Sequence, residues 1–160
     1  MEKKLSSMSP ELYLKWAQEA LSKGIAQRDL DNRAAQGIQI LQLQKGFVRC
    51  NFIVPATALD ANGKWHVGAI ATIMDTAGAI AVYSETNRSK VVTDYNISYY
   101  STAKIQDEIE IEGRVVANKG KLTSVMVEVR RKDNGELIAT GKQWTASNDF
   151  RAPLGQPSKL

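Results

Sequence analysis

A single carboxylate interrupts a long apolar segment of this sequence. Between Val67 and Tyr83 the only charged residue is Asp75, and most of its neighbours are small: Gly68, Ala69, Ala71, Ala77, Gly78, Ala79 and Ala81. Such a segment is expected to lie in a protein core, where an ionised carboxylate is costly unless it is paired. Asp75 is therefore a candidate general base or nucleophile. The alternative is a structural aspartate that bonds to Thr72, Thr76 or the backbone.

His66 stands directly before this segment and is the only histidine of the chain. A metal site or a catalytic triad that needs two histidines is therefore excluded, and we expect no metal and no cofactor. At the predicted start of a helix, His66 could cap the helix, pack against it, or orient another group of a site.

The segments around the apolar run have the alternation of β-strands. Residues 37–54 (GIQILQLQKGFVRCNFIV) predict two strands joined at Lys45-Gly46. Four further strand segments follow, within residues 89–100, 108–118 and 121–147, the last divided by the hairpin signal Asp133-Asn134-Gly135. One apolar helix among six strands predicts an α+β fold in which an antiparallel sheet curls around the helix.

Both ends of the chain differ from this central part. Ser9-Pro10-Glu11 is typical of a helix start, so residues 1–36 are predicted to form an N-terminal helical extension. The main domain is expected over 37–147, and 148–160 as a flexible tail. The last residues, Ser158-Lys159-Leu160, match the tripeptide that the peroxisomal import receptor binds. We therefore expect delivery to the peroxisomal matrix.

The composition excludes several classes of protein. The net charge is +4 and the basic residues are scattered along the 160-residue chain, so we expect no nucleic-acid partner. Asp75 in the middle of the apolar run argues against a membrane span. The only cysteine, Cys50, cannot form an intramolecular disulfide and is predicted to be a buried structural thiol.

Three motifs resemble those of one known family. The stretch HVGAIATIMD resembles the H-G-G-x(6)-D signature of hotdog-fold thioesterases. VTDYNISYYSTAKIQDEI resembles a strand and loop of that family, and NKGKL with DNGELIATG resembles its closing hairpins. The resemblance covers roughly residues 37–147. It implies a hotdog fold, a curved antiparallel sheet around one long helix, and hydrolysis of a fatty or aromatic acyl-CoA.

The resemblance also implies roles for residues near the helix start. The backbone N–H of Val67, where the family has glycine, would stabilise the oxyanion, with His66 and Gly68 beside it. Asp75 would be the base or nucleophile and would face a neighbouring subunit. Relatives carry an asparagine a few residues before the histidine that helps to position the water or the carbonyl. The same spacing gives Asp60 here, and a short shift of the loop could supply Asn62 instead.

Further roles implied by the resemblance concern the substrate and the assembly. Relatives have a serine, an accessory polar group of the site, at the position of Val92. Thr93 should point to the other face of its strand and so cannot simply replace that serine. Lys119 and Lys121 are candidates to bind the phosphates of coenzyme A. The family forms a dimer with a continuous sheet, and two dimers form a tetramer. The main alternative is a protein that binds acyl-CoA without turnover. A hydratase, which would need a His/Asp or His/Glu pair, ranks last because the single histidine stands at the helix start.

Overall fold

The computed structural model describes residues 9, 11–12, 15, 18–19 and 29–147. Residues 11–12, 15 and 18–19 are helical, in agreement with the helix predicted to start near Ser9. The predicted tail, with Ser158-Lys159-Leu160, lies outside the described residues.

Helix α4 (Val67–Thr86) is the long apolar helix that the sequence predicts. It begins after His66, whose extended backbone (φ −65°, ψ 131°) and side chain form the N-cap. It ends at Asn87, which has a left-handed backbone (φ 53°) and donates its N–H to the Tyr83 carbonyl. The helix thus runs three residues beyond Tyr83, where the apolar run stops.

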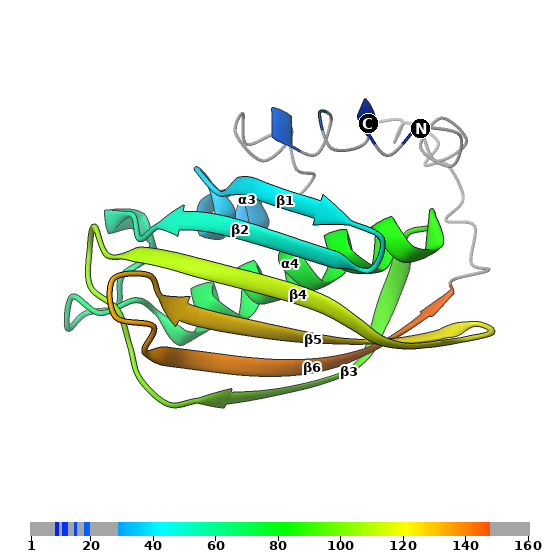
Figure 1. Cartoon of the computed structure of the whole chain (residues 1–160). Helices are drawn as coiled ribbons and strands as arrows, with labels where there is room; N and C mark the ends of the chain where they lie inside the picture. Colours follow the sequence, from blue (N-terminus) through cyan, green and yellow to red (C-terminus); the bar gives the residue numbers. More distant parts are fainter. Residues whose placement is uncertain (1–8, 10, 13–14, 16–17, 20–28, 148–160) are drawn as a thin grey trace, which may run out of the picture.

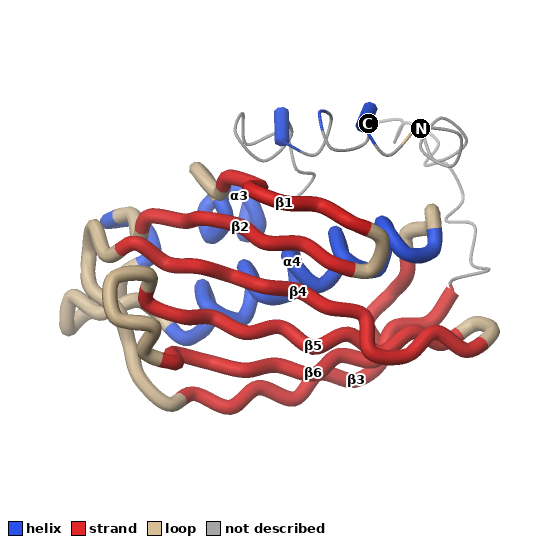
Figure 2. Tube along the Cα trace, viewed as in Figure 1, coloured by secondary structure: helices blue, strands red, loops and turns tan. Residues whose placement is uncertain are grey.

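Six strands form one antiparallel sheet, as predicted: β1 (Gln39–Gln44), β2 (Phe47–Ile53), β3 (Lys90–Tyr99), β4 (Glu108–Lys119), β5 (Leu122–Arg131) and β6 (Leu137–Ser147). Their order in the sheet is β1-β2-β4-β5-β6-β3, so β4, β5 and β6 form a meander and β3 crosses over to one edge. Figures 1 and 2 show α4 lying across one face of this sheet. The predicted turns are confirmed at Gly46 and Gly135, which have φ of +70° and +72°.

The core lies between α4 and the inner face of the sheet. Buried side chains of α4 pack against buried side chains of β2, β4 and β5, among them Ile70, Ile73, Met74, Cys50, Phe52, Ile109, Ile111, Val125 and Val127. Close approach of helix and sheet needs Gly113, because a Cβ there would stand 3.0 Å from the Ala77 carbonyl oxygen. Cys50 is buried in this core, as predicted, and burial raises the pKa of its thiol to about 12.

Among the described residues, α4 alone has the length and hydropathy of a membrane-spanning helix. Half of that segment is buried within the fold, and its partner is the sheet. Its apolar character is therefore accounted for by the core of the domain.

Helix α3 (Asp29–Ala35) lies within the stretch predicted as a helical extension; it forms from a polar segment without clear periodicity and contacts α4. A 3₁₀ turn, η1 (Ala56–Ala58), and an interruption of β3 were not predicted. In β3 the pairing with β6 shifts between Val92 and Asp94. Thr93 is the extra residue of a β-bulge, so the strict alternation expected along this strand is wrong.

Candidate active site

The start of α4 is held by neighbouring loops. The N–H of Trp65 donates to the Ala103 carbonyl (2.8 Å), and that of His66 donates to the Ala58 carbonyl (2.9 Å). Trp65 is buried and its ring stacks on Phe52, with 5.6 Å between the ring centroids. These contacts fix the direction in which α4 leaves the loop.

One backbone donor in the first turn of α4 is left over. The Gly68 N–H donates to His66 Nδ1 (2.9 Å), so the imidazole caps the helix. Within the described part of the chain, the Val67 N–H donates no hydrogen bond, and Val67 is 55% exposed. The Tyr99 hydroxyl donates to the Val67 carbonyl (3.1 Å). The Val67 N–H therefore sits at the positive end of a 20-residue helix and can receive an anionic oxygen.

Asp60 and Asn62 lie in the exposed turn that precedes this helix start. Asp60 Oδ1 accepts from the N–H of Asn62 (2.8 Å) and from the N–H of Lys64 (3.0 Å). The bond from Lys64, together with that from Asn62 and the nearby cationic groups, lowers the pKa of the Asp60 carboxyl. Asp60 thus organises the turn, while the Asn62 side chain is exposed to solvent.

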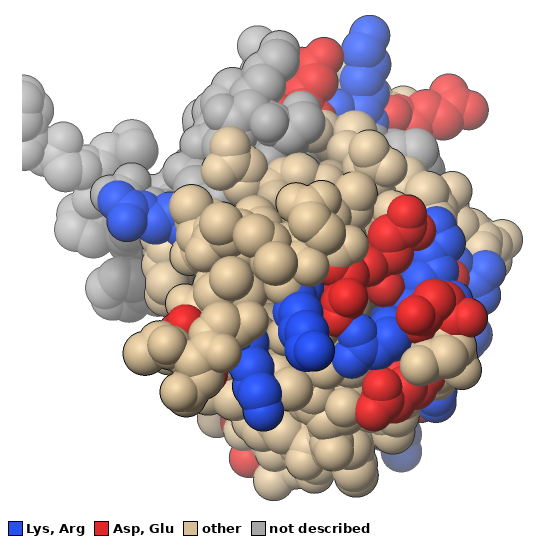
Figure 3. Space-filling model, turned by 90° about the vertical axis from the view of Figure 1, so that its left-hand side faces the viewer, with Lys and Arg blue, Asp and Glu red and all other residues tan. Residues whose placement is uncertain are grey.

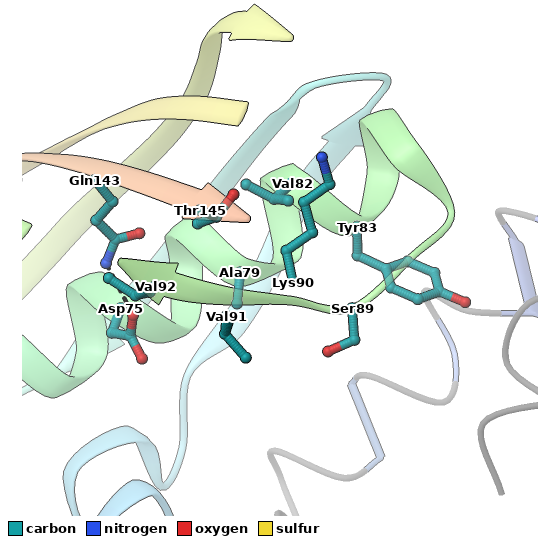
Figure 4. Close-up of a pocket in the computed structure, with 10 residues that line it drawn as sticks. All are labelled: Asp75, Ala79, Val82, Tyr83, Ser89, Lys90, Val91, Val92, Gln143 and Thr145. Atoms are coloured by element: carbon teal, nitrogen blue, oxygen red, sulfur yellow. Dashed lines mark hydrogen bonds between the residues drawn. The ribbon is translucent and has the colours of Figure 1, made fainter. Parts of the chain in front are cut away.

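Asp75 lies on the half-buried face of α4. Its Oδ1 accepts a hydrogen bond from Gln143 Nε2 on β6 (2.9 Å), as Figure 4 shows. The hydroxyls of Thr72 and Thr76 donate to the carbonyls of Gly68 and Thr72 instead. The hydroxyl hydrogens of Thr72 and Thr76 are thus used on the helix backbone, whereas Gln143 donates to Asp75.

Gln143 is a site residue that the sequence did not reveal. It is 0% exposed, and its Oε1 has no hydrogen-bond partner among the described residues. A Cβ on Gly78 would stand 2.3 Å from that oxygen, so the helix has space for the amide only because residue 78 is glycine. A glycine in the middle of a long helix was the one signal in the sequence that pointed here.

Tyr95 of β3 lies beside this pair. Its hydroxyl donates to the Ala71 carbonyl (3.2 Å). Burial raises the pKa of Tyr95, and the negative charge of Asp75 raises it further. Tyr95 is therefore a neutral phenol at the edge of the site.

A pocket of about 460 Å³ opens from Asp75 toward the end of α4. Asp75 and Gln143 lie at one end of it, and Lys90 lies near the other (Figure 4). The walls come from α4, β3 and β6 and combine apolar side chains, among them Ala79, Val82, Val91 and Val92, with polar ones. Asp75 thus lies beside a groove with space for an apolar chain.

Of the remaining predicted site residues, one lines this pocket and three lie outside it. Val92 lines it, opposite Thr145 of β6. Thr93 does not line it, and its hydroxyl donates to the Trp144 carbonyl (3.1 Å). Lys119 and Lys121 flank the β4–β5 turn outside the pocket; the Lys121 carbonyl accepts from Lys90 Nζ (3.2 Å). No three His, Cys, Asp or Glu side chains of the described residues gather as a metal site would need.

Ion pairs tie the loops together at the end of the molecule where α4 begins, which Figure 3 shows as interleaved acidic and basic side chains. Arg131 pairs with Asp107 and with Glu136 (3.2 Å) and donates to the Thr102 carbonyl (2.6 Å). It thereby holds the loop whose Ala103 carbonyl binds Trp65. The pKa of Asp107 is lowered first by the Lys104 N–H and then by Arg131, and that of Glu136 first by Ser101 and then by Arg131.

Arg131→Met is expected to lower the free energy of unfolding by about 1–3 kcal/mol at pH 7, because partly buried hydrogen bonds that involve charged groups are lost. Carboxyls with a lowered pKa stabilise the fold above their ordinary pKa, and this contribution is lost as the pH falls below about 4. The difference from the wild type should therefore shrink toward pH 3 in urea titrations. Lys132→Met, which removes an exposed pair with Glu108, is the matched control and should cost less than about 1 kcal/mol. An equal effect of both variants would contradict this role of Arg131.

Comparison with known proteins gives one consistent result. Residues 62–138 match the family described as the thioesterase superfamily. Human acyl-coenzyme A thioesterase 13 is 31% identical over 106 residues, which cover 66% of this chain and 76% of the human protein. The crystal structure of zebrafish thioesterase superfamily member 2 matches with a TM-score of 0.77 and 26% identity, covering 84% of this chain and 98% of that one. The family match over residues 62–138 spans both His66 and Asp75.

A bacterial structure shares the fold at lower identity. A Streptococcus mutans protein bound to acetyl-CoA has a TM-score of 0.68 and 22% identity, covering 73% of this chain and 93% of that protein. At this identity the likeness speaks for the architecture alone: six antiparallel strands around one long helix.

Proposed function

Because this chain belongs to the thioesterase superfamily and has its hotdog fold, as the sequence predicted, we propose that it hydrolyses acyl-CoA thioesters to a free acid and coenzyme A. The observation that supports this most is that one helix carries two unusual groups. One is the carboxylate of Asp75 at a pocket with an apolar wall, and the other is the N–H of Val67 at the helix start, which donates no hydrogen bond among the described residues.

The two groups have complementary roles in thioester hydrolysis. Asp75 takes a proton from the attacking water, or attacks the carbonyl carbon itself and is released by water in a second step. The carbonyl oxygen becomes an oxyanion that accepts from the Val67 N–H. The tetrahedral intermediate then collapses, the C–S bond breaks, and coenzyme A leaves as a thiolate that takes up a proton. His66 keeps the first turn of the helix in place through its bond to Gly68.

One protomer alone does not bring these groups together. Val67 and Asp75 are eight residues apart on one helix, which at about 1.5 Å per residue is about 12 Å along the axis. A base and an oxyanion donor must both lie within about 3 Å of atoms of the same carbonyl group. We therefore propose that Asp75 of one protomer acts with Val67 of a second copy, in a dimer.

The edge of the sheet offers the surface for such a dimer. Strand β3 pairs only with β6 among the described strands, so the backbone on its outer side is open. Val91, Val92 and Tyr99 along it are 40–45% exposed. At the opposite edge, the Gln18 side chain accepts from the Ile40 N–H and donates to the Ile38 carbonyl, which blocks pairing at β1. Light scattering should give at least twice the 17.6 kDa chain mass, and a monomer would contradict the shared site.

One wall of the pocket suits an apolar acyl group. Ala79, Val82, Val91 and Val92 form walls along which a fatty or aromatic acyl chain could extend beyond Asp75. Lys119 and Lys121, on the β4–β5 turn beside Lys90, are our candidates for binding phosphates of coenzyme A.

A thiol-release assay over a series of acyl-CoA chain lengths tests the proposed function. We expect turnover that rises with chain length until the groove is filled, with aromatic acyl-CoA as a separate arm of the series. If acyl-CoA binds, as measured by calorimetry, but no thiol is released at any length, the chain is an acyl-CoA-binding protein rather than an enzyme.

A further inference from the structure

We propose that Gln143 is a positioning residue that fixes the Asp75 carboxylate for catalysis, in place of the polar side chain that β3 lacks at Val92. This inference rests on the proposed function. Three observations support it: the contact with Asp75, the complete burial of the amide, and the accommodation of that amide by the helix.

The contact is direct and involves a charged acceptor. Gln143 Nε2 donates to Asp75 Oδ1 at 2.9 Å, the distance of a charge-assisted hydrogen bond. The side chain is 0% exposed, and its strand is paired on both sides, with β5 and with β3. An amide held in this way has few alternative rotamers, so it fixes one orientation of the carboxylate beside the pocket (Figure 4).

The fold accepts two unfavourable features in order to keep this amide. Gln143 Oε1 is buried without a partner among the described residues, which destabilises the folded state. Gly78 occupies a helix interior, where glycine is less favourable than alanine. An apolar residue at position 143 together with alanine at position 78 would avoid both. The stability of the fold therefore gives no reason for Gln143, whereas the orientation of Asp75 does.

Two hydroxyl groups near the pocket are engaged elsewhere. Tyr95 uses its hydroxyl hydrogen on the Ala71 carbonyl, and Thr145 uses its own on the Thr123 carbonyl. Val92, which lines the same pocket, has no polar atom in its side chain. Gln143 is thus the pocket-lining amide whose N–H is directed to the carboxylate.

The titratable groups on the elements around Asp75 allow a clear pH test. Burial raises the pKa of Tyr95 and of Tyr83, so both are neutral phenols over the range of the assay. Lys90, whose pKa is lowered by burial, lies toward the other end of the pocket. Because the Gln143 amide contacts Asp75, a difference in the acidic limb of the kcat profile between the wild type and a Gln143 variant reports this carboxylate. Loss of an N–H that favours the charged carboxylate should move this limb to higher pH.

Gln143→Leu removes the amide and keeps a side chain of similar size. We expect kcat to fall about 10- to 100-fold, with KM within about threefold of the wild type and the acidic limb moved to higher pH. Ser124→Ala is the matched control, because it removes another buried unpartnered polar atom from a neighbouring strand but not from the pocket. It should leave kcat, KM and the pH profile unchanged.

Gly78→Ala tests the same role while residue 143 is still glutamine. Its Cβ would displace the amide oxygen, so we expect the same fall in kcat and the same shift of the limb in protein that is folded by circular dichroism. Wild-type kcat and an unshifted limb in Gln143→Leu, or in folded Gly78→Ala if the former does not fold, would overturn the proposal. If the wild type hydrolyses acyl-CoA and the Gln143 variant has the same kcat and pH profile, only the positioning role of Gln143 is wrong. If the wild type itself shows no turnover, the proposed function is wrong.

Discussion

Replacement of Asp75 by asparagine is expected to lower kcat for acyl-CoA hydrolysis by about 10²-fold or more. Asparagine keeps the size of the side chain, and its carbonyl oxygen can still accept from Gln143 Nε2, so the fold and the oligomer should be intact. The variant has neither a base for water nor a nucleophile. The loss should therefore appear in kcat, with KM little changed.

Steady-state thiol release, with circular dichroism and light scattering on the same preparation, measures this effect. A kcat within about threefold of the wild type in an intact oligomer would make Asp75 a structural residue. The catalytic role of the carboxylate would then be wrong, whatever binds in the pocket.

Val67→Pro should also remove catalysis, because proline lacks the backbone N–H that would bind the oxyanion. Val67 is the first residue of α4, a position at which proline is favoured, and its N–H donates no hydrogen bond among the described residues. His66 already has the extended backbone that a following proline requires. We therefore expect an unchanged melting temperature and a kcat lowered by about 10²–10³-fold, the usual effect of losing one oxyanion donor.

Val67→Ala is the matched control for this substitution. It also shortens the exposed side chain but keeps the N–H, so most of the activity should be retained. If the proline and alanine variants have similar kcat values, the oxyanion is not stabilised by this N–H, and the helix start serves another purpose.

Much of the fold could be predicted because the signals lie within single segments. The apolar run gave α4, the alternation of side chains gave the strands, and glycines such as Gly46 and Gly135 marked the turns. The bounds of helix α3 within the expected helical extension could not be predicted, because its segment is polar and the helix contacts α4 across a long sequence separation.

The candidate site was only partly visible, for a related reason. His66 and Asp75 stand out in a short segment, whereas Gln143 is one residue of an ordinary alternating strand, 68 positions from Asp75. Its importance depends on the pairing of β6 beside β3 and on the space at Gly78. The bulge at Thr93 likewise arises from the pairing of two strands and leaves no mark in the local pattern.

The most direct test of the shared site mixes two inactive variants. Asp75→Asn and Val67→Pro chains are unfolded together in equal amounts and refolded, so that about half of the dimers contain one chain of each kind. If Asp75 of one protomer acts with Val67 of the other, each mixed dimer has one site with both groups intact and one site with neither. Activity should then return to about a quarter of the wild-type value, while each variant refolded alone is inactive. No recovery in a mixture shown to contain heterodimers would contradict a site shared between two protomers.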